Sequence, residues 1–144
     1  MILIFKLKKM LLTGIDIIEI HRIKDVCQKY PNRFMKKIFT DQEIDYCRGR
    51  FPQIAARFAS KEAVMKALGT GIRGVPWKSI EVYRPRGKAP EIRLYGNAKR
   101  KAEELGINEI AISISHSRNY AAVSYTHLRA HETDSYLVCR LLLE

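Results

Sequence analysis

The sequence contains no apolar run near the roughly 18 residues that a membrane span needs. In residues 1–9 the charged side chains follow the apolar ones, which reverses the order of a secretory signal. The three cysteines, Cys27, Cys47 and Cys139, have neither the spacing of a metal site nor a paired disulfide pattern. These absences predict a cytoplasmic protein without membrane contact, and they argue against redox or zinc chemistry.

Acidic residues are scarce, since 15 Asp and Glu stand against 26 Lys and Arg, for a net charge of +11. Such a field attracts anions, and nucleic acid, an acidic protein or a polyphosphate cofactor would each satisfy it. No RNA-binding stacking motif or zinc-finger pattern favours nucleic acid. A length of 144 residues with 47% hydrophobic content predicts one compact domain.

The order of periodic segments predicts an α+β fold with an antiparallel sheet packed on a long helix. Thr40 and Glu43 form a capping box at one helix start, and a long helix follows from Pro52 to a stop at Gly69. The other expected elements are a strand over 11–20, helices over 22–30 and 97–105, a hairpin from 80–82 to 92–94, a strand over 110–114 and a further strand starting at 120.

Asp16 interrupts the first strand, whose apolar residues on both faces indicate a buried position. An unpaired carboxylate is costly to desolvate. Asp16 therefore either forms a hydrogen bond at a strand end or holds a cation, and the residues alone leave both open.

The long helix carries Arg57, Lys61, Glu62 and Lys66 just before Gly69. The three cations could present one surface to phosphates, or they could form a solvated basic face. Glu62 could pair with Lys66 one turn later, which contributes only about 0.2–0.5 kcal/mol. Downstream, His116 lies in a Ser-His-Ser turn, but no Gly-x-Ser-x-Gly elbow supports a nucleophile there.

Three spaced motifs occur in order: Gly-Ile-Asp-Ile-Ile-Glu-Ile from residue 14, Arg-Phe-Ala-Ser-Lys-Glu-Ala-Val-Met-Lys-Ala-Leu-Gly-Thr-Gly from residue 57, and Ser-Ile-Ser-His-Ser from residue 113. Together they closely resemble the holo-acyl-carrier-protein synthase family of phosphopantetheinyl transferases, over residues 10–122. The resemblance implies that family's fold and a magnesium-dependent transfer of 4′-phosphopantetheine from coenzyme A to a serine of apo-acyl carrier protein. It also implies release of adenosine 3′,5′-bisphosphate, a setting in fatty-acid synthesis, and a homotrimer with coenzyme A bound between subunits.

The same resemblance assigns roles to individual residues. Asp16 and Glu62 would hold Mg²⁺, and Glu62 and Lys66 would act in catalysis, with Glu62 or a metal-bound water as the base. Residues near the long helix and after the strand at 110–114 would contact coenzyme A: Arg57, Lys61, Lys66, Gly69, His116 and Ser117. Arg22, in a basic stretch after the first strand, would dock the acidic carrier protein.

Both ends of the chain are expected to lie outside the domain at 10–122. The sequence from Met10 to Asp16 matches the way this family begins, so residues 1–9 are expected to come from an upstream start codon. Residues 123–133 and 137–144 look like two parts of a sequencing-library adapter in one reading frame, separated by an index-sized gap. We therefore expect 123–144 to be a non-native tail with few specific contacts beyond Tyr125, and we exclude its histidines and Cys139 from any site. The alternative is a native C-terminal helix.

Two other readings of function remain at this stage. A basic nucleic-acid-binding module would explain the charge, although Asp16 and Glu62 do not suit it. An inactive, truncated transferase would follow if the terminal strand normally continues beyond Ala122.

Overall fold

The computed structural model describes residues 10–129. In chain order its elements are β1 (Met10–Glu19), α1 (Ile20–Lys29), α2 (Pro31–Ile38), α3 (Asp41–Cys47), α4 (Phe51–Leu68), α5 (Gly71–Gly74), the 3₁₀ turn η1 (Trp77–Ser79), β2 (Ile80–Tyr83), β3 (Glu91–Leu94), α6 (Gly96–Glu104), β4 (Ile107–His116) and β5 (Tyr120–Arg129).

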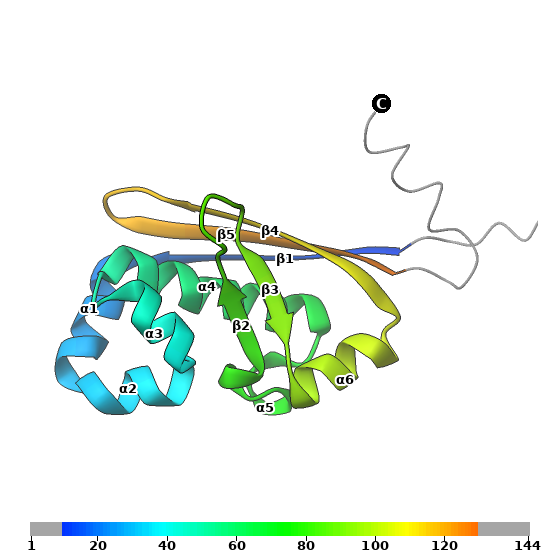
Figure 1. The fold of residues 1–144 in the computed structure, drawn as a ribbon, viewed down its shortest axis with the longest axis horizontal. Coiled ribbons are helices and arrows are strands. Elements are labelled where there is room, and N and C mark those ends of the chain that lie inside the picture. The colour runs from blue at the N-terminus through cyan, green and yellow to red at the C-terminus, as the bar shows by residue number, and fades with distance from the viewer. Residues whose placement is uncertain (1–9, 130–144) are drawn as a thin grey trace, which may run out of the picture.

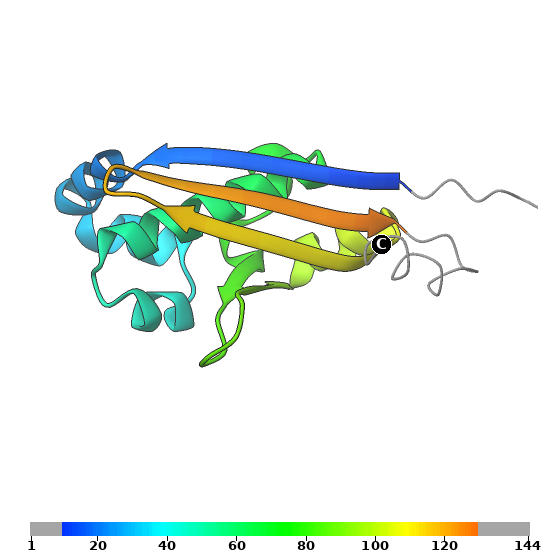
Figure 2. The ribbon, with the colours of Figure 1, turned by 90° about the horizontal axis from the view of Figure 1, so that it is seen from above.

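Two antiparallel sheets form the β structure. The larger has the order β1-β5-β4, and the β2-β3 hairpin forms a separate two-stranded sheet. The helices lie on one side of the three-stranded sheet, with α4 beneath it (Figure 1), and the view from above shows the long strands lying across α4 (Figure 2). The predicted α+β fold, with an antiparallel sheet packed on a long helix, is confirmed.

Local signals set the ends of the helices as expected. Thr40 and Glu43 form the capping box of α3, in which the Thr40 hydroxyl accepts from the Glu43 amide and the Glu43 carboxylate accepts from the Thr40 amide. Pro52 occupies the first turn of α4, and Gly69 ends this helix in the left-handed conformation, with φ 71°.

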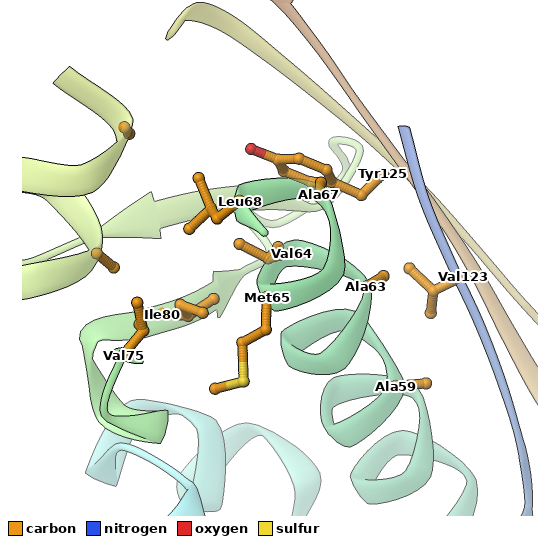
Figure 3. Close-up of a cluster of buried hydrophobic side chains, with 12 residues drawn as sticks. Ala59, Ala63, Val64, Met65, Ala67, Leu68, Val75, Ile80, Val123 and Tyr125 are labelled. Atoms are coloured by element: carbon orange, nitrogen blue, oxygen red, sulfur yellow. The ribbon is translucent and has the colours of Figure 1, made fainter. Parts of the chain in front are cut away.

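Helix α4 is the centre of both hydrophobic clusters. Its first half packs with α1, α2 and α3 through Ile54, Ala55 and Ala56. Its second half packs against β2, α6 and β5, and Figure 3 shows Ala59, Ala63 and Ala67 on the helix beside Val123 and Tyr125. Small alanine side chains allow the helix to approach the sheet closely.

At Gly14 the backbone of β1 lies directly against α4. A Cβ atom at this position would lie 2.0 Å from the carbonyl oxygen of Ala63. Because this neighbour is backbone, no side-chain movement could relieve the contact. The missing side chain therefore fixes how near β1, and with it Asp16, comes to the helix.

The expectation that β1 is buried on both faces is wrong for the single chain. Even-numbered residues such as Asp16 face the helices, whereas Ile15 and Ile17 are 67% and 64% exposed. The reason is that no layer of residues 10–129 covers the outer face of the sheet. Within the same range, no helix combines the length and apolar character of a membrane span.

The expectation of few contacts beyond Tyr125 is also wrong as far as residue 129. Strand β5 pairs with both β1 and β4 to its end, and residues 126–129 lie opposite 10–13. Tyr125 and His127 are buried, with their rings in edge-to-face contact at 5.4 Å between centroids. His131 and Cys139 lie outside the described residues, and the adapter origin of the tail stays a prediction from the sequence.

Candidate active site

Asp16 meets Lys66 where β1 crosses the C-terminal half of α4. The Lys66 ammonium lies 2.6 Å from Asp16 Oδ1 and also donates to the Ile15 carbonyl at 3.1 Å. The Asp16 side chain is only 8% exposed. Among the described residues, its second oxygen, Oδ2, has no hydrogen-bond partner although it is buried. Lys66 thus offsets the charge of Asp16 but leaves one carboxylate oxygen unsatisfied.

Glu62 lies beside this pair, one helical turn before Lys66. Burial, followed by the neighbouring Asp16 carboxylate, raises the pKa of Glu62 to about 7, while Lys66 and Arg22 act in the opposite direction. A partly buried carboxylate beside a second carboxylate favours either a proton on Glu62 or a bound cation. The structure therefore brings together Asp16, Glu62 and Lys66, and it also places Arg22, which the sequence assigned to a separate docking surface, near Glu62.

The donor set fits a hard divalent cation that keeps part of its water shell. Two carboxylates converge, and the buried Asp16 Oδ2 is available as a ligand. Within residues 10–129 no group of three or more His, Cys, Asp or Glu could form a complete protein cage. Mg²⁺ is commonly bound through one or two carboxylates, with waters and phosphate oxygens completing its octahedron.

A cavity of about 480 Å³ adjoins the acidic pair at the end of α4. Its lining runs through Glu62, Met65 and Lys66 to the residues that follow the helix, Thr70, Gly71, Ile72 and Arg73. Gly69 itself does not line the cavity. Its left-handed conformation turns the chain so that the next four residues close one side of this space.

A second cavity, of about 350 Å³, lies at the other end of α4 and holds Arg57 and His116. Its remaining lining residues are Tyr46, Gln53, Ala56, Arg84, Pro90, Ile114 and Ser115. None of these residues is acidic, so the cavity presents positive charge. Arg57 and Lys66 are nine residues apart on one helix, which separates them by about 13 Å along its axis. Nine residues also place the two side chains on opposite sides of the helix, so the two cavities open on different faces of α4.

Ser117 does not line either cavity. Its hydroxyl oxygen accepts from the backbone amides of Asn119 and Tyr120, at 3.3 and 3.2 Å, in the turn between β4 and β5. In this position Ser117 shapes the turn that ends β4 at His116. His21, by contrast, forms an ion-pair contact with Glu19 at 3.3 Å and lies on the exposed surface.

The assignment of Lys61 to the coenzyme A surface is wrong, because its side chain is 0% exposed. Its ammonium lies 2.8 Å from Glu43 Oε2 and donates to the carbonyls of Ile38, Trp77 and Ile80 at 2.7–3.0 Å. Glu43 also accepts from the Val82 amide. Burial lowers the pKa of Lys61, and the Glu43 carboxylate opposes that shift. Lys61 is a structural cation that joins α4 to α3 and β2.

Sequence reasoning missed Tyr46 and Arg84 in the second cavity. Tyr46 comes shortly after the capping box of α3, and its ring lies 3.9 Å from the guanidinium carbon of Arg57. Arg84 follows β2 at the start of the hairpin turn. No periodic pattern links these segments to α4. An arginine beside a predicted hairpin in a basic chain could, however, have indicated Arg84 as a candidate anion contact.

Comparison with known proteins identifies the family of the chain. Residues 13–123 match the model of the 4′-phosphopantetheinyl transferase superfamily. The holo-[acyl-carrier-protein] synthase of Moorella thermoacetica is 46% identical over 116 residues, covering 78% of this chain and 90% of the relative. That of Chlamydia caviae is 49% identical over 118 residues, covering 78% and 93%.

Solved structures agree in fold. The Helicobacter pylori holo-[acyl-carrier-protein] synthase in complex with coenzyme A superimposes with a TM-score of 0.74 at 31% identity, covering 81% of this chain and 99% of that one. The Plasmodium yoelii acyl carrier protein synthase with ADP bound gives a TM-score of 0.77 at 26% identity, covering 86% and 99%. The chain belongs to the 4′-phosphopantetheinyl transferase superfamily and is a relative of its holo-[acyl-carrier-protein] synthases.

Proposed function

We propose that this protein transfers the 4′-phosphopantetheine group from coenzyme A to a serine of apo-acyl carrier protein, in the pathway of fatty-acid synthesis. The main support for this proposal is that Asp16, Glu62 and Lys66 converge at one end of a helix, while Arg57 lies in a basic cavity at its other end. Phosphoryl chemistry of this kind depends mainly on positioning and charge neutralisation.

In the reaction, the serine oxygen bonds to the phosphorus that carries pantetheine, and the bond from this phosphorus to the leaving adenosine 3′,5′-bisphosphate breaks. Bound to Asp16 and Glu62, Mg²⁺ would neutralise charge on the pyrophosphate. Lys66 adds an ammonium that is open to the same phosphates, since its side chain is 55% exposed. Glu62 or a water bound to the cation would accept the serine proton.

The carrier protein would dock on α1 and α2. Arg22 is exposed on α1 and close enough to Glu62 to influence its pKa, so a carrier held there presents its serine near the reacting phosphorus. Beside it, Val26, Tyr30, Arg33, Phe34 and Lys37 line a groove of about 290 Å³. A basic groove with an apolar floor suits an acidic helical partner.

The active form would be a homotrimer. The outer face of the three-stranded sheet exposes Leu11, Ile15, Ile17 and Tyr120, an apolar surface that a monomer would leave in water. Burying this face between subunits would place the nearby turn at His116 against a neighbouring chain. Light scattering should give three times the monomer mass, and Ile15→Glu with Ile17→Glu should yield monomers.

The decisive experiment is intact-mass measurement of an apo-acyl carrier protein incubated with coenzyme A, Mg²⁺ and this protein. We expect the carrier to gain one phosphopantetheine group, and to gain none with a chelator present. Asp16→Ala and Glu62→Ala should each abolish transfer while the fold persists, whereas the matched control Glu103→Ala, an exposed acid on α6, should retain it. Near-normal transfer by either site variant at limiting Mg²⁺ would refute the assigned ligands.

A further inference from the structure

Arg57 occupies an environment that leaves its guanidinium unsatisfied. Only 4% of the residue is exposed, and Nε has no hydrogen-bond partner among the described residues. Its one hydrogen bond runs from Nη1 to the Gln53 carbonyl of the same helix, at a long 3.4 Å. Within residues 10–129 no carboxylate lies within ion-pair distance of it. A buried cation without a counter-charge is costly unless a ligand supplies one.

The group that does contact Arg57 closely is the ring of Tyr46. At 3.9 Å from the ring centroid, the guanidinium carbon lies within the range of a favourable cation–π contact. A guanidinium that stacks on a ring uses a face of its plane for the contact and keeps its N–H donors for other groups, because the donors lie in that plane.

Hydrogen bonds from the Arg50 side chain fix the backbone at Tyr46. Arg50 donates from Nη2 to the Tyr46 carbonyl at 2.6 Å and from Nε to the Cys47 carbonyl at 2.9 Å. These bonds tie the end of α3 to the start of α4. The ring is therefore presented by a fixed element rather than by a free loop.

Tyr46 and Arg57 line the same cavity as Arg84 and His116. We propose that Tyr46 is a positioning residue for the coenzyme A reaction: its ring orients Arg57 so that the guanidinium edge meets a phosphate of the nucleotide. This inference rests on the proposed function, because it takes coenzyme A as the source of that phosphate. Tyr46 acts through Arg57 and needs no contact with the reacting atoms.

The test is a double-mutant cycle on binding of adenosine 3′,5′-bisphosphate, measured by calorimetry. Loss of a desolvated cation–π contact predicts that Tyr46→Leu weakens binding roughly tenfold. Tyr46→Phe, which keeps the ring, should bind within about twofold of the original protein. In an Arg57→Gln background, Tyr46→Leu should have almost no further effect.

Tyr83→Leu is the matched control. Its ring stacks on Arg93 at 3.5 Å, so the substitution removes a similar contact from residues that do not line the cavity. Urea unfolding of every variant identifies loss of fold, and Tyr46→Met, which keeps bulk without a ring, replaces the leucine variant if that one unfolds.

The outcomes separate the two hypotheses. If the original protein neither binds the nucleotide nor modifies a carrier, the proposed function fails. If it does both, the positioning role is overturned by undiminished binding in folded Tyr46→Leu, by an equal loss in Tyr46→Phe, or by a tenfold loss that persists without Arg57.

Discussion

Gly14→Ala should show how far the active site depends on the approach of β1 to α4. The added Cβ would lie 2.0 Å from the Ala63 carbonyl oxygen, whereas ordinary contact begins near 3.4 Å. Strand and helix must therefore separate by about 1.4 Å at this point, because the opposing atom is backbone. Asp16 lies two residues further along β1, and Glu62 directly precedes Ala63 on α4.

The cost should reach the upper end of the range for overpacked cores, about 3 kcal/mol or more. A shift of this size is also large compared with the 2.6 Å contact between Asp16 and Lys66. We therefore expect two losses together: a lower free energy of unfolding, and a weaker dependence of coenzyme A binding on Mg²⁺, because the two carboxylates no longer converge.

Urea unfolding measures the first loss, and calorimetric titration of coenzyme A with and without Mg²⁺ measures the second. Gly87→Ala is the control, since Gly87 has φ +73° and nothing within 4 Å of its added Cβ. That variant meets backbone strain of about 1–2 kcal/mol without a clash and should keep its response to Mg²⁺. A Gly14→Ala protein with an unchanged urea midpoint and unchanged Mg²⁺ response would refute the reasoning.

Three further predictions follow from the charged groups. Lys61→Met should lower the free energy of unfolding by about 3–5 kcal/mol, because it leaves Glu43 buried without its counter-charge, and adding Glu43→Gln, which removes the charge but keeps an acceptor for the Val82 amide, should recover part of this loss in urea unfolding. In Mg²⁺-free protein, stability should fall as pH rises from 4.5 to about 7, because folded Glu62 keeps a proton that the unfolded chain has lost; a Glu62→Gln protein with the same pH dependence would contradict this. Arg22→Glu should weaken carrier binding strongly at low salt, with less effect on coenzyme A affinity, and the reverse pattern, or an equal effect of Lys99→Glu on α6, would exclude docking at α1.

Local sequence signals were sufficient for the elements that depend on neighbouring residues. The capping box at Thr40 and the glycine stop at Gly69 set helix ends because the groups that satisfy each end lie within a few residues of it. Residues 126–129 show the limit of such reasoning. These residues pair with β1 and β4, two strands distant in sequence. Backbone hydrogen bonds to two existing strands extend β5 whether or not its side chains suit that position.

The outer face of β1 shows a second limit. Ile15 and Ile17 are apolar residues in a strand whose other face is covered by α4, and their pattern alone equally suits burial within a chain or between chains. Sequence periodicity reports which residues avoid water but not which molecule covers them. In the proposed trimer, α4 would cover one face of β1 and a neighbouring subunit would cover the other, so both faces would be buried as the apolar pattern predicts.

Lys61 and Lys66 show what the spacing on α4 could have revealed. At about 100° per residue, Lys61 lies about 40° from Arg57 around the helix axis, whereas Lys66 lies about 40° from Glu62 and about 140° from Lys61. The helix therefore carries two charged faces rather than one: Arg57 and Lys61 face α3, with Tyr46 and Glu43 as their partners, while Glu62 and Lys66 face β1 and Asp16. The angles separate the two pairs, but only the position of α3 explains why Lys61 is sealed inside while Lys66 remains open to a ligand.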